Sequence, residues 1–491
     1  MGRSTSDRRV SRSFRRLLVW TLVLIILSPF LAIAAYYGFE NVSGQMAWRV
    51  AQQKLEQLGE PLAVADIRPA PLPDDRNMAA APIFRQLFAT DPTVVAAADL
   101  SLLRLPAELP GDHASDIVGL ARGFQADFSG TARDAAAIVS DGLAPMAEII
   151  TRLRAAADRP ESSWPISLDG SFNFSMPFLK PLARAAEVIA ARGMAALADD
   201  SPSEALADFH LITDLAAHSN EPSLLVSSLL EQSMLLEAIR VVEEGTTAQT
   251  WSGPDLAAIQ DRLSRVHPLR RFADSVRGER VLFLQASDQL DFKASAFFAI
   301  VDISNATVEK RTRALSYFIW GLRPSGWRAR DRARYLTLSQ EYLDTVIANE
   351  IVDVAAVAEW NARIRSIRRD DFEMFRTPLT VLTLPAFGAA ARRAAFAQSR
   401  VDQARLACAL ERFRLRHADL PQRLGELLPE FIDRLPRDVI GGRHFAYRRT
   451  SPDSFTLHSL GWNGRDDSKL PASVNEPRDA LNRPDWTWAS R

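Results

Sequence analysis

The sequence predicts a mainly α protein with an N-terminal transmembrane helix, an antiparallel helical body and a small C-terminal α+β module that contains a β-hairpin. Three observations support this fold class. One long apolar run without charge lies near the N-terminus. The region from residue 131 to residue 398 repeats apolar positions at helical spacing between breaks of Pro, Gly, Asp and Ser. Beyond residue 420, apolar and polar residues alternate as they do in β-strands.

The apolar run extends from Leu17 to Phe39 and has 23 residues without a charge. As a helix it is roughly 34 Å long, which is enough to cross the ~30 Å hydrocarbon core of a bilayer. Trp20 lies near one end and Tyr36 and Tyr37 lie near the other. Aromatic rings at both ends are typical of helices that meet the membrane surface. We expect this run to be the membrane contact of the protein.

The orientation of the anchor follows from the charge of the preceding residues. Residues 1–16 carry six arginines and one acid. Positive charge favours the cytoplasmic side, so we expect a single pass with a cytoplasmic N-terminus and an exported body. A cleaved secretory signal is the competing interpretation, because Ala32-Ile33-Ala34 resembles an A-x-A processing site. Cleavage after Ala34 would still export the body.

The net charge argues against one class of function, and the single cysteine excludes two structural features. The chain has a formal net charge of −1, and because the N-terminal arm contributes +5, the rest stands at −6. A mildly acidic exported body argues against nucleic-acid binding. Cys408 is the one cysteine, so the chain has neither an internal disulfide nor a metal site built from several cysteines.

Five segments follow from these patterns. They are a cytoplasmic basic arm (1–16), the transmembrane anchor (17–39), a stalk and Pro-rich linker (40–76), a helical domain (77–398) and a C-terminal α+β module (399–491). The helices expected in the body cover residues 177–199, 202–219, 223–244, 254–266, 268–290, 327–347 and 352–369. Their short connections predict antiparallel neighbours. Residues 191–209 resemble one tetratricopeptide-type hairpin, but no second copy follows, which favours a generic helical hairpin.

The final section predicts a β-hairpin. Phe445 and Tyr447, and then Phe455 and Leu457, alternate with polar residues around the turn at 451–453. A short helix over residues 422–428 is expected to precede the hairpin.

The residues ALERFRLRHADLPQRLGELLPEFIDRLPRD, then FAYRR, FTLHSLGWNGRDD and PDWTW, resemble the globular module of type II secretion major pseudopilins. The resemblance covers about residues 404–488. Arg16-Leu17 replaces the prepilin-peptidase site of that family, so the resemblance does not extend to a filament subunit. Over its whole length the chain resembles a group of uncharacterised bacterial membrane-anchored, mostly helical proteins. This second resemblance implies the bacterial inner membrane, with the body in the periplasm.

The pseudopilin resemblance also implies a calcium site. Its ligands would be Asn463, Asp466 and Asp467, together with Asp485. Calcium binds several hard oxygen ligands from a flexible loop, which such a segment can supply. Ser468-Lys469 stands where the family has a glycine pair, so a solvated acidic turn is the competing interpretation. Apart from calcium, we expect no cofactor.

Other candidate sites are weaker. The sequence contains no H-E-x-x-H, Walker, G-x-G-x-x-G, G-x-S-x-G or C-x-x-C string, so no catalytic residue is assigned. His210 and His218 share a helix face, either as a ligand pair or, as we expect, as ordinary helix histidines. The run Arg277-Gly278-Glu279-Arg280 places charges in an apolar helix. A buried ion pair that fixes the register of the helix is expected there, and a general acid role for Glu279 is the alternative.

One basic and aromatic cluster remains. Its members are Trp327, Arg328, Arg330, Arg332, Arg334 and Tyr335. We expect a solvated start of a helix, and an anionic lipid surface or an acidic glycan is the alternative. The apolar runs 296–303, 314–322 and 379–390 are too short to span a membrane and are expected in the core or in a partner groove.

These observations favour a non-enzymatic envelope protein that binds or scaffolds a protein partner. An envelope hydrolase with acidic residues supplied by several helices is one alternative. A component associated with a secretion system is the other.

Overall fold

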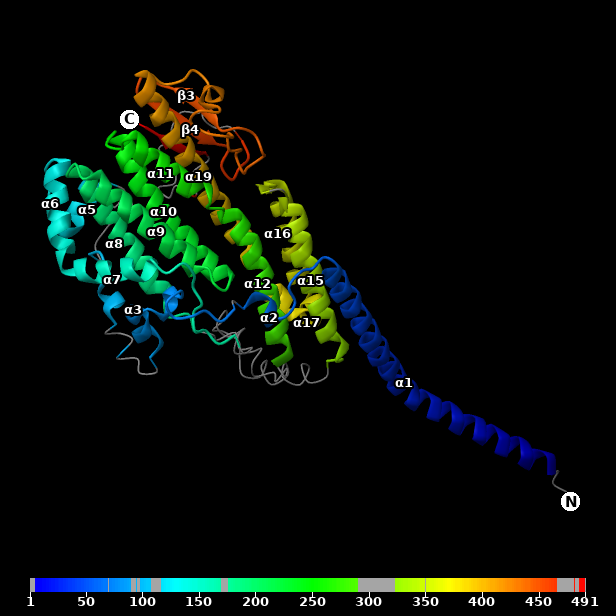
Figure 1. The fold of residues 1–491 in the computed structure, drawn as a ribbon. Coiled ribbons are helices and arrows are strands. Elements are labelled where there is room, and N and C mark those ends of the chain that lie inside the picture. Colours follow the sequence, from blue (N-terminus) through cyan, green and yellow to red (C-terminus); the bar gives the residue numbers. More distant parts are fainter. Residues whose placement is uncertain are drawn as a thin grey trace. The chain divides into compact units, whose positions relative to one another are not determined.

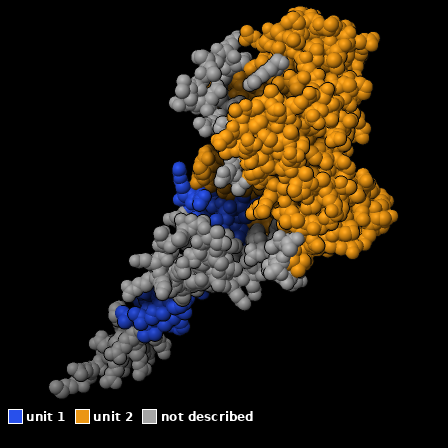
Figure 2. All heavy atoms as spheres, turned by 90° about the vertical axis from the view of Figure 1, so that its left-hand side faces the viewer, with its two compact units in different colours: residues 1–60, 287–337, 367–383 blue, residues 61–286, 338–366, 384–491 orange. Residues whose placement is uncertain are grey.

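The computed structural model describes residues 5–68, 70–89, 94, 98–106, 116–168, 175–289, 323–348, 350–465, 481 and 485–490. The chain divides into two compact units (Figure 2). Unit 1 comprises residues 1–60, 287–337 and 367–383, and unit 2 comprises residues 61–286, 338–366 and 384–491. The predicted fold class is confirmed, because the chain is mostly helical, begins with a long apolar helix and carries a small antiparallel sheet near its C-terminus.

Unit 1 begins with helix α1 (Thr5–Gln57), which Figure 1 shows as one continuous ribbon. The helix runs through Pro29 without ending and continues to Gln57, through the first part of the segment expected as a stalk and linker. Its apolar side chains between Leu17 and Phe39 are mostly exposed, and the mean hydropathy of its most apolar stretch is 2.6. Among the described helices, α1 is the one long and apolar enough to cross a membrane.

The other helices of unit 1 pack closely and cap one another. They are the part of α15 (Gly326–Val346) up to residue 337, α17 (Asp371–Arg376) and α18 (Pro378–Thr383). A Cβ at Gly44 would lie 2.0 Å from the carbonyl oxygen of Gly326, so α1 and α15 meet backbone to backbone. The buried carboxylate of Asp331 accepts the N–H groups of Leu379 and Thr380, both at 3.1 Å. These bonds satisfy two backbone donors at the start of α18.

Unit 2 holds the remaining described helices, apart from the ends of two of them that belong to unit 1. The helices that were predicted from the sequence begin and end within three residues of their predicted positions. The longer ones are α5 (Ile117–Phe124), α6 (Ala132–Leu143), α7 (Ala147–Ala157), α8 (Leu179–Ala198), α9 (Pro202–Ser219), α10 (Leu225–Thr247), α11 (Gly253–Ser264), α12 (Pro268–Gln289), α16 (Val354–Arg369) and α19 (Ala386–His417). The short ones are α2 (Val64–Ile67), α3 (Pro82–Arg85) and the 3₁₀ turns η1 (Met78–Ala80), η2 (Gln86–Phe88), η3 (Asp99–Leu102), η4 (Ala144–Met146) and η5 (Leu424–Leu427). Thr131 and Ser252 begin α6 and α11 as capping boxes. The helix expected over 422–428 is the 3₁₀ turn η5.

The centre of unit 2 is a layer of the helices α8, α9 and α10, each in contact with the other two. Residues 191–209 form the predicted hairpin between α8 and α9. The buried carboxylate of Asp208 on α9 binds Arg154 of α7 at 2.9 Å and Arg192 of α8. A Cβ at Gly193 would lie 3.2 Å from Val241 of α10, so a small residue at 193 allows the close packing of these helices.

The C-terminal part of unit 2 is a three-stranded antiparallel sheet beside α19 (Figure 1). Its order is β3 (Ala446–Arg449), β4 (Phe455–Ser459) and β5 (Trp486–Ala489), and Leu457 pairs with both Tyr447 and Trp488. A further short pair joins β1 (Ile347–Ala348) to β2 (Ile351–Val352). The predicted hairpin is β3–β4, and β5 completes the sheet.

The sheet, α19 and the helices from α5 to α11 share one hydrophobic core. Gln403 of α19 donates to the carbonyl of Trp486 at 2.6 Å. The guanidinium of Arg400 lies 4.8 Å from the ring centre of Trp488 and binds Glu243 of α10 at 2.6 Å. The boundary expected at residue 398 falls inside α19, and the same helix contributes to both the helical layer and the sheet.

Candidate functional site

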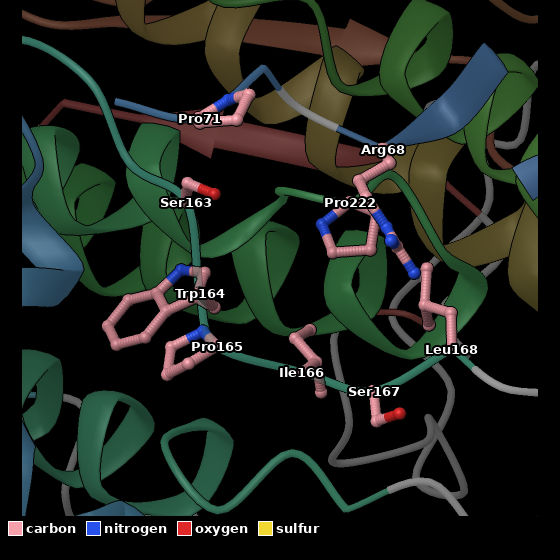
Figure 3. Close-up of a pocket in the computed structure, with 9 residues that line it drawn as sticks. All are labelled: Arg68, Pro71, Ser163, Trp164, Pro165, Ile166, Ser167, Leu168 and Pro222. Carbon is pink, nitrogen blue, oxygen red and sulfur yellow. The ribbon is translucent and has the colours of Figure 1, made fainter. Parts of the chain in front are cut away.

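A groove of about 530 Å³ in unit 2 is the first candidate site (Figure 3). An extended segment, residues 163–168, forms one wall. Arg68 and Pro71 come from the Pro-rich segment that follows α2, and Pro222 comes from the turn between α9 and α10. In Figure 3, Pro222 lies between Arg68 and the extended segment that carries Ile166.

The wall of the groove is held in place by Trp164. Its indole stacks on Phe178, with 4.0 Å between ring centres and an angle of 5° between the planes. Its Nε1 donates to the carbonyl of His218 at 2.9 Å, and Ser162 donates to the same carbonyl at 2.8 Å. Because a buried aromatic ring and two hydrogen bonds fix this extended segment, the groove has a preformed wall.

The described lining of the groove is mainly apolar. It combines prolines and apolar side chains with one cation, the exposed Arg68, whose guanidinium pairs with no acid among the described residues. Ser163 and Ser167 line the groove, and no carboxylate or histidine lies beside them among the described lining residues. A serine nucleophile needs a base within hydrogen-bond reach, so the described lining lacks the arrangement for acyl transfer.

A cluster of carboxylates lies on the turn and helices adjoining Pro222. Glu231 of α10 is 4% exposed and accepts from Asn220 at 2.7 Å. Arg271 of α12 stands between two acids, with its Nε 3.9 Å from Glu231 and its Nη1 3.8 Å from Glu221. The amide oxygen of Asn220 is buried without a hydrogen-bond partner in the described part of the chain.

The electrostatics of this cluster favour a neutral acid. Burial raises the pKa of Glu231 to about 7, against the opposing effects of Arg271 and the Asn220 hydrogen bond. Burial also raises the pKa of Glu221. A carboxyl group that titrates near neutral pH can both give and accept a proton. The cluster therefore has the electrostatic property that general acids share.

The predicted calcium ligands are described only in part. Asn463 lies in the turn after β4 and accepts the backbone N–H of Arg465 at 2.8 Å, and Asp485 directly precedes β5. Asp466 and Asp467 lie outside the described residues. Among the described residues, no group of three His, Cys, Asp or Glu side chains is placed to hold a metal ion. The calcium site stays a prediction.

His210, His218 and Cys408 lie in packed surroundings. His210 packs edge-on against Phe209, and burial lowers the pKa of both His210 and His218. Cys408 is fully buried on α19, and burial raises the pKa of its thiol to about 12. These environments suit neutral imidazoles and an unreactive thiol.

Glu279 and Arg280, expected to form a buried ion pair, each contact a different element. Glu279 accepts the N–H of Leu225 at 2.9 Å, at the start of α10. Arg280 donates to Ser339 at 3.1 Å and to Gln340 at 2.9 Å. The two charges thus join α12 to two other helices. Burial raises the pKa of Glu279, but it does not line the groove of Figure 3.

The expectation of a solvated helix start at Trp327–Tyr335 is wrong. Trp327 and Tyr335 are buried, and three of the arginines are bound by acids of unit 1. These pairs are Arg330 with Glu40, Arg332 with Asp288 and Arg334 with Glu373. The basic residues mainly neutralise acids within the unit, which a single sequence does not reveal because the partners are distant along the chain. Arg328 is exposed as expected.

The expected core residues of the run 379–390 are buried, among them Leu379, Leu384 and Phe387. The runs 296–303 and 314–322 lie outside the described residues.

Sequence reasoning missed Glu231, Arg68 and Glu40. Glu231 is an acid among apolar residues, and Leu235 and Ala238 on the same helix face are buried with it. An acid at helical spacing from core residues was a usable signal. Glu40 directly follows the apolar run, and its partners Trp327 and Arg376 lie far away along the chain. No local pattern marked Arg68, because its place in the groove depends on residues that are distant in sequence.

The described residues define a mainly helical protein with one N-terminal apolar helix suited to membrane anchoring, and with a preformed groove in its larger unit. Comparison with models of protein families, with curated proteins and with solved structures finds no match to this chain.

Proposed function

We propose that the protein is a single-pass, cytoplasm-in protein of the bacterial inner membrane whose periplasmic body binds or scaffolds a protein partner. The observation that carries this proposal is the exposed apolar surface of α1 between Leu17 and Phe39, following an arm rich in arginine. Apolar surface of this extent is unfavourable in water and favourable in a bilayer. The excess of arginine in the arm favours retention of the N-terminus in the cytoplasm.

A pair of fusions tests the topology. Alkaline phosphatase, which is active only after export, is fused after Arg491, and an epitope tag is placed before Met1. We expect phosphatase activity and a tagged, full-length chain that alkaline carbonate does not extract from the membrane. Activity of a cytosolic reporter alone at residue 491 would overturn the proposed location. Loss of the tag with release of the body would replace the anchor by a cleaved signal after Ala34.

The groove of Figure 3 supports the binding role. Its prolines, Ile166 and Arg68, which pairs with no acid in the described ranges, suit an extended peptide segment that carries a negative charge. A photo-cross-linking amino acid in place of Ile166 is expected to give one defined adduct in cells, which Arg68→Glu reduces. The same amino acid at Leu415, exposed on α19, is the control and should not give that adduct. Equal adducts at both positions would contradict a specific groove.

A second candidate function is that of an envelope hydrolase. It is favoured by the two acids Glu221 and Glu231, which lie on either side of Arg271. If the cluster supplies a general acid, Glu231→Gln abolishes hydrolysis of the substrate while the variant stays folded. An unchanged rate would exclude this role.

The secretion-system alternative depends on the calcium loop. We expect calcium to raise the melting temperature of the purified chain if Asn463, Asp466 and Asp467 bind it. The double change Asp466→Ala, Asp467→Ala should remove that increase. A wild-type melting temperature unaffected by calcium would remove the support for this alternative.

A further inference from the structure

The point where α1 ends its apolar run is fixed by unit 1. Phe39, the last residue of the run, is 67% exposed, whereas the next residue, Glu40, is 4% exposed. The carboxylate of Glu40 accepts from Nε1 of Trp327 at 3.0 Å and from Nη2 of Arg376 at 3.0 Å. Arg330 lies 3.5 Å from the same carboxylate. Glu40 is therefore buried on the face of α1 that packs against α15 and α17, whereas Val42 and Met46 on other faces of the helix stay more than 60% exposed.

The start of α15 lies at the same height along α1. Asn41 accepts the N–H of Gly326 at 2.8 Å, and Ser43 accepts from Arg330 at 2.6 Å. A helix rises ~1.5 Å per residue, so these residues of α1 lie within about 6 Å of Phe39 along the axis. The polar layer on each side of a bilayer is about 5 to 8 Å thick. With residues 17–39 in the hydrocarbon core, the first turn of α15 lies at headgroup height.

The exposed side chains at this height suit a lipid surface. Phe372 of α17 is 50% exposed, and its ring packs edge-on against Trp327 at 5.7 Å between centres. Arg328 is exposed and pairs with no acid in the described part of the chain. Residues 323–337 and 367–376 together carry eight arginines, of which Arg330, Arg332, Arg334 and Arg376 pair with acids of unit 1. Aromatic and basic side chains next to a membrane helix are typical of contact with anionic headgroups.

We propose that this end of unit 1, formed by the first turn of α15 and by α17, lies in the headgroup layer around α1 and binds anionic phospholipids. Arg328 pairs with lipid phosphate, and the ring of Phe372 lies at the boundary with the acyl chains. The bilayer is the occupant because the surface is continuous with the lipid-facing surface of α1. The inference rests on the proposed membrane anchor.

Spin labels measure the depth of this surface in the full-length chain. Single nitroxides are placed at Phe372→Cys, Leu24→Cys and Leu415→Cys, in nanodiscs that contain phosphatidylcholine and phosphatidylglycerol. The native Cys408 is buried and serves as the labelling background. We expect the ratio of collisions with oxygen to collisions with a water-soluble nickel chelate to be highest at residue 24, lower at residue 372 and lowest at residue 415.

The outcomes separate the two proposals. A lipid-like ratio at Leu24→Cys together with equal, water-like ratios at 372 and 415 would overturn the headgroup contact and leave the anchor intact. A water-like ratio at Leu24→Cys would overturn the anchor itself. A label at Arg328→Cys repeats the measurement in case Phe372→Cys disturbs the packing against Trp327.

The preference of the protein for anionic over zwitterionic lipid tests the role of Arg328. Spin-labelled phosphatidylglycerol is expected to be immobilised by the protein in a larger fraction than spin-labelled phosphatidylcholine. Arg328→Gln should lower this preference. Arg393→Gln, which removes an exposed arginine from α19 in unit 2, should leave it unchanged. Equal preferences in the wild type and Arg328→Gln would overturn the assignment of Arg328 to anionic headgroups.

Discussion

Replacement of Glu231 by glutamine should make the stability of unit 2 less sensitive to pH. Glu231 is buried, and burial raises its pKa from 4.5 to about 7. Between these values the folded chain holds a proton that the unfolded chain has released, so the free energy of unfolding falls as pH rises. The shift corresponds to roughly 3 kcal/mol at 1.36 kcal/mol per pKa unit. The loss of unfolding free energy is absent below the pKa that Glu231 has in the unfolded chain, and it is complete above the pKa that Glu231 has in the folded chain.

Glutamine at position 231 removes the negative charge and keeps an oxygen that can accept the hydrogen bond from Asn220. We expect Glu231→Gln to gain up to about 3 kcal/mol relative to the wild type between about pH 4.5 and about pH 8. Urea denaturation of the detergent-solubilised chain, followed by tryptophan fluorescence, measures the difference. Glu359→Gln, at an exposed position on α16, is the control and should follow the wild type. If Glu231→Gln and the wild type lose stability in parallel as pH rises, the buried carboxyl is not the cause.

Three further outcomes follow from the packing. Trp488→Ala should destabilise unit 2 by about 3 to 5 kcal/mol in urea denaturation, because the ring is fully buried in the sheet; a change within error would contradict its place in the core. Gly44→Ala should increase proteolysis of unit 1, because the added Cβ would meet the carbonyl of Gly326. Gly38→Ala is the matched control and should leave proteolysis unchanged, because no atom lies within 4 Å of the Cβ position at residue 38. The Cys408 thiol, whose pKa burial raises to about 12, should react with maleimide only after unfolding, and rapid labelling of the native chain would refute its burial.

Local patterns along the chain predicted most of the fold. Proline and serine at helix starts placed α9 and α11, and alternation placed β3 and β4, because these signals act within one turn or one hairpin. The third strand was not predicted, although Trp486 and Trp488 alternate with exposed residues. A strand of four residues needs its partner to be recognised, and β4 lies more than twenty residues earlier.

The sites were less accessible to sequence reasoning because their partners are distant in sequence. Glu40 meets Arg330 and Arg376, which lie about 300 residues away. Glu231 gains its raised pKa from burial between α10 and α12 and from neighbouring acids. The sequence shows that a charge is present, but burial and pairing depend on the packed helices around it.

The unbroken course of α1 through Glu40 sets the reach of unit 1. A Gly/Ser-rich tether would let an attached unit explore tens of ångströms, whereas a helix clamped at its exit by two arginines allows little bending there. If α1 spans the bilayer as proposed, a rotation or tilt of its apolar segment is transmitted directly to the helices bound at Glu40. Unit 1 is then held close to the bilayer surface and does not swing away from it.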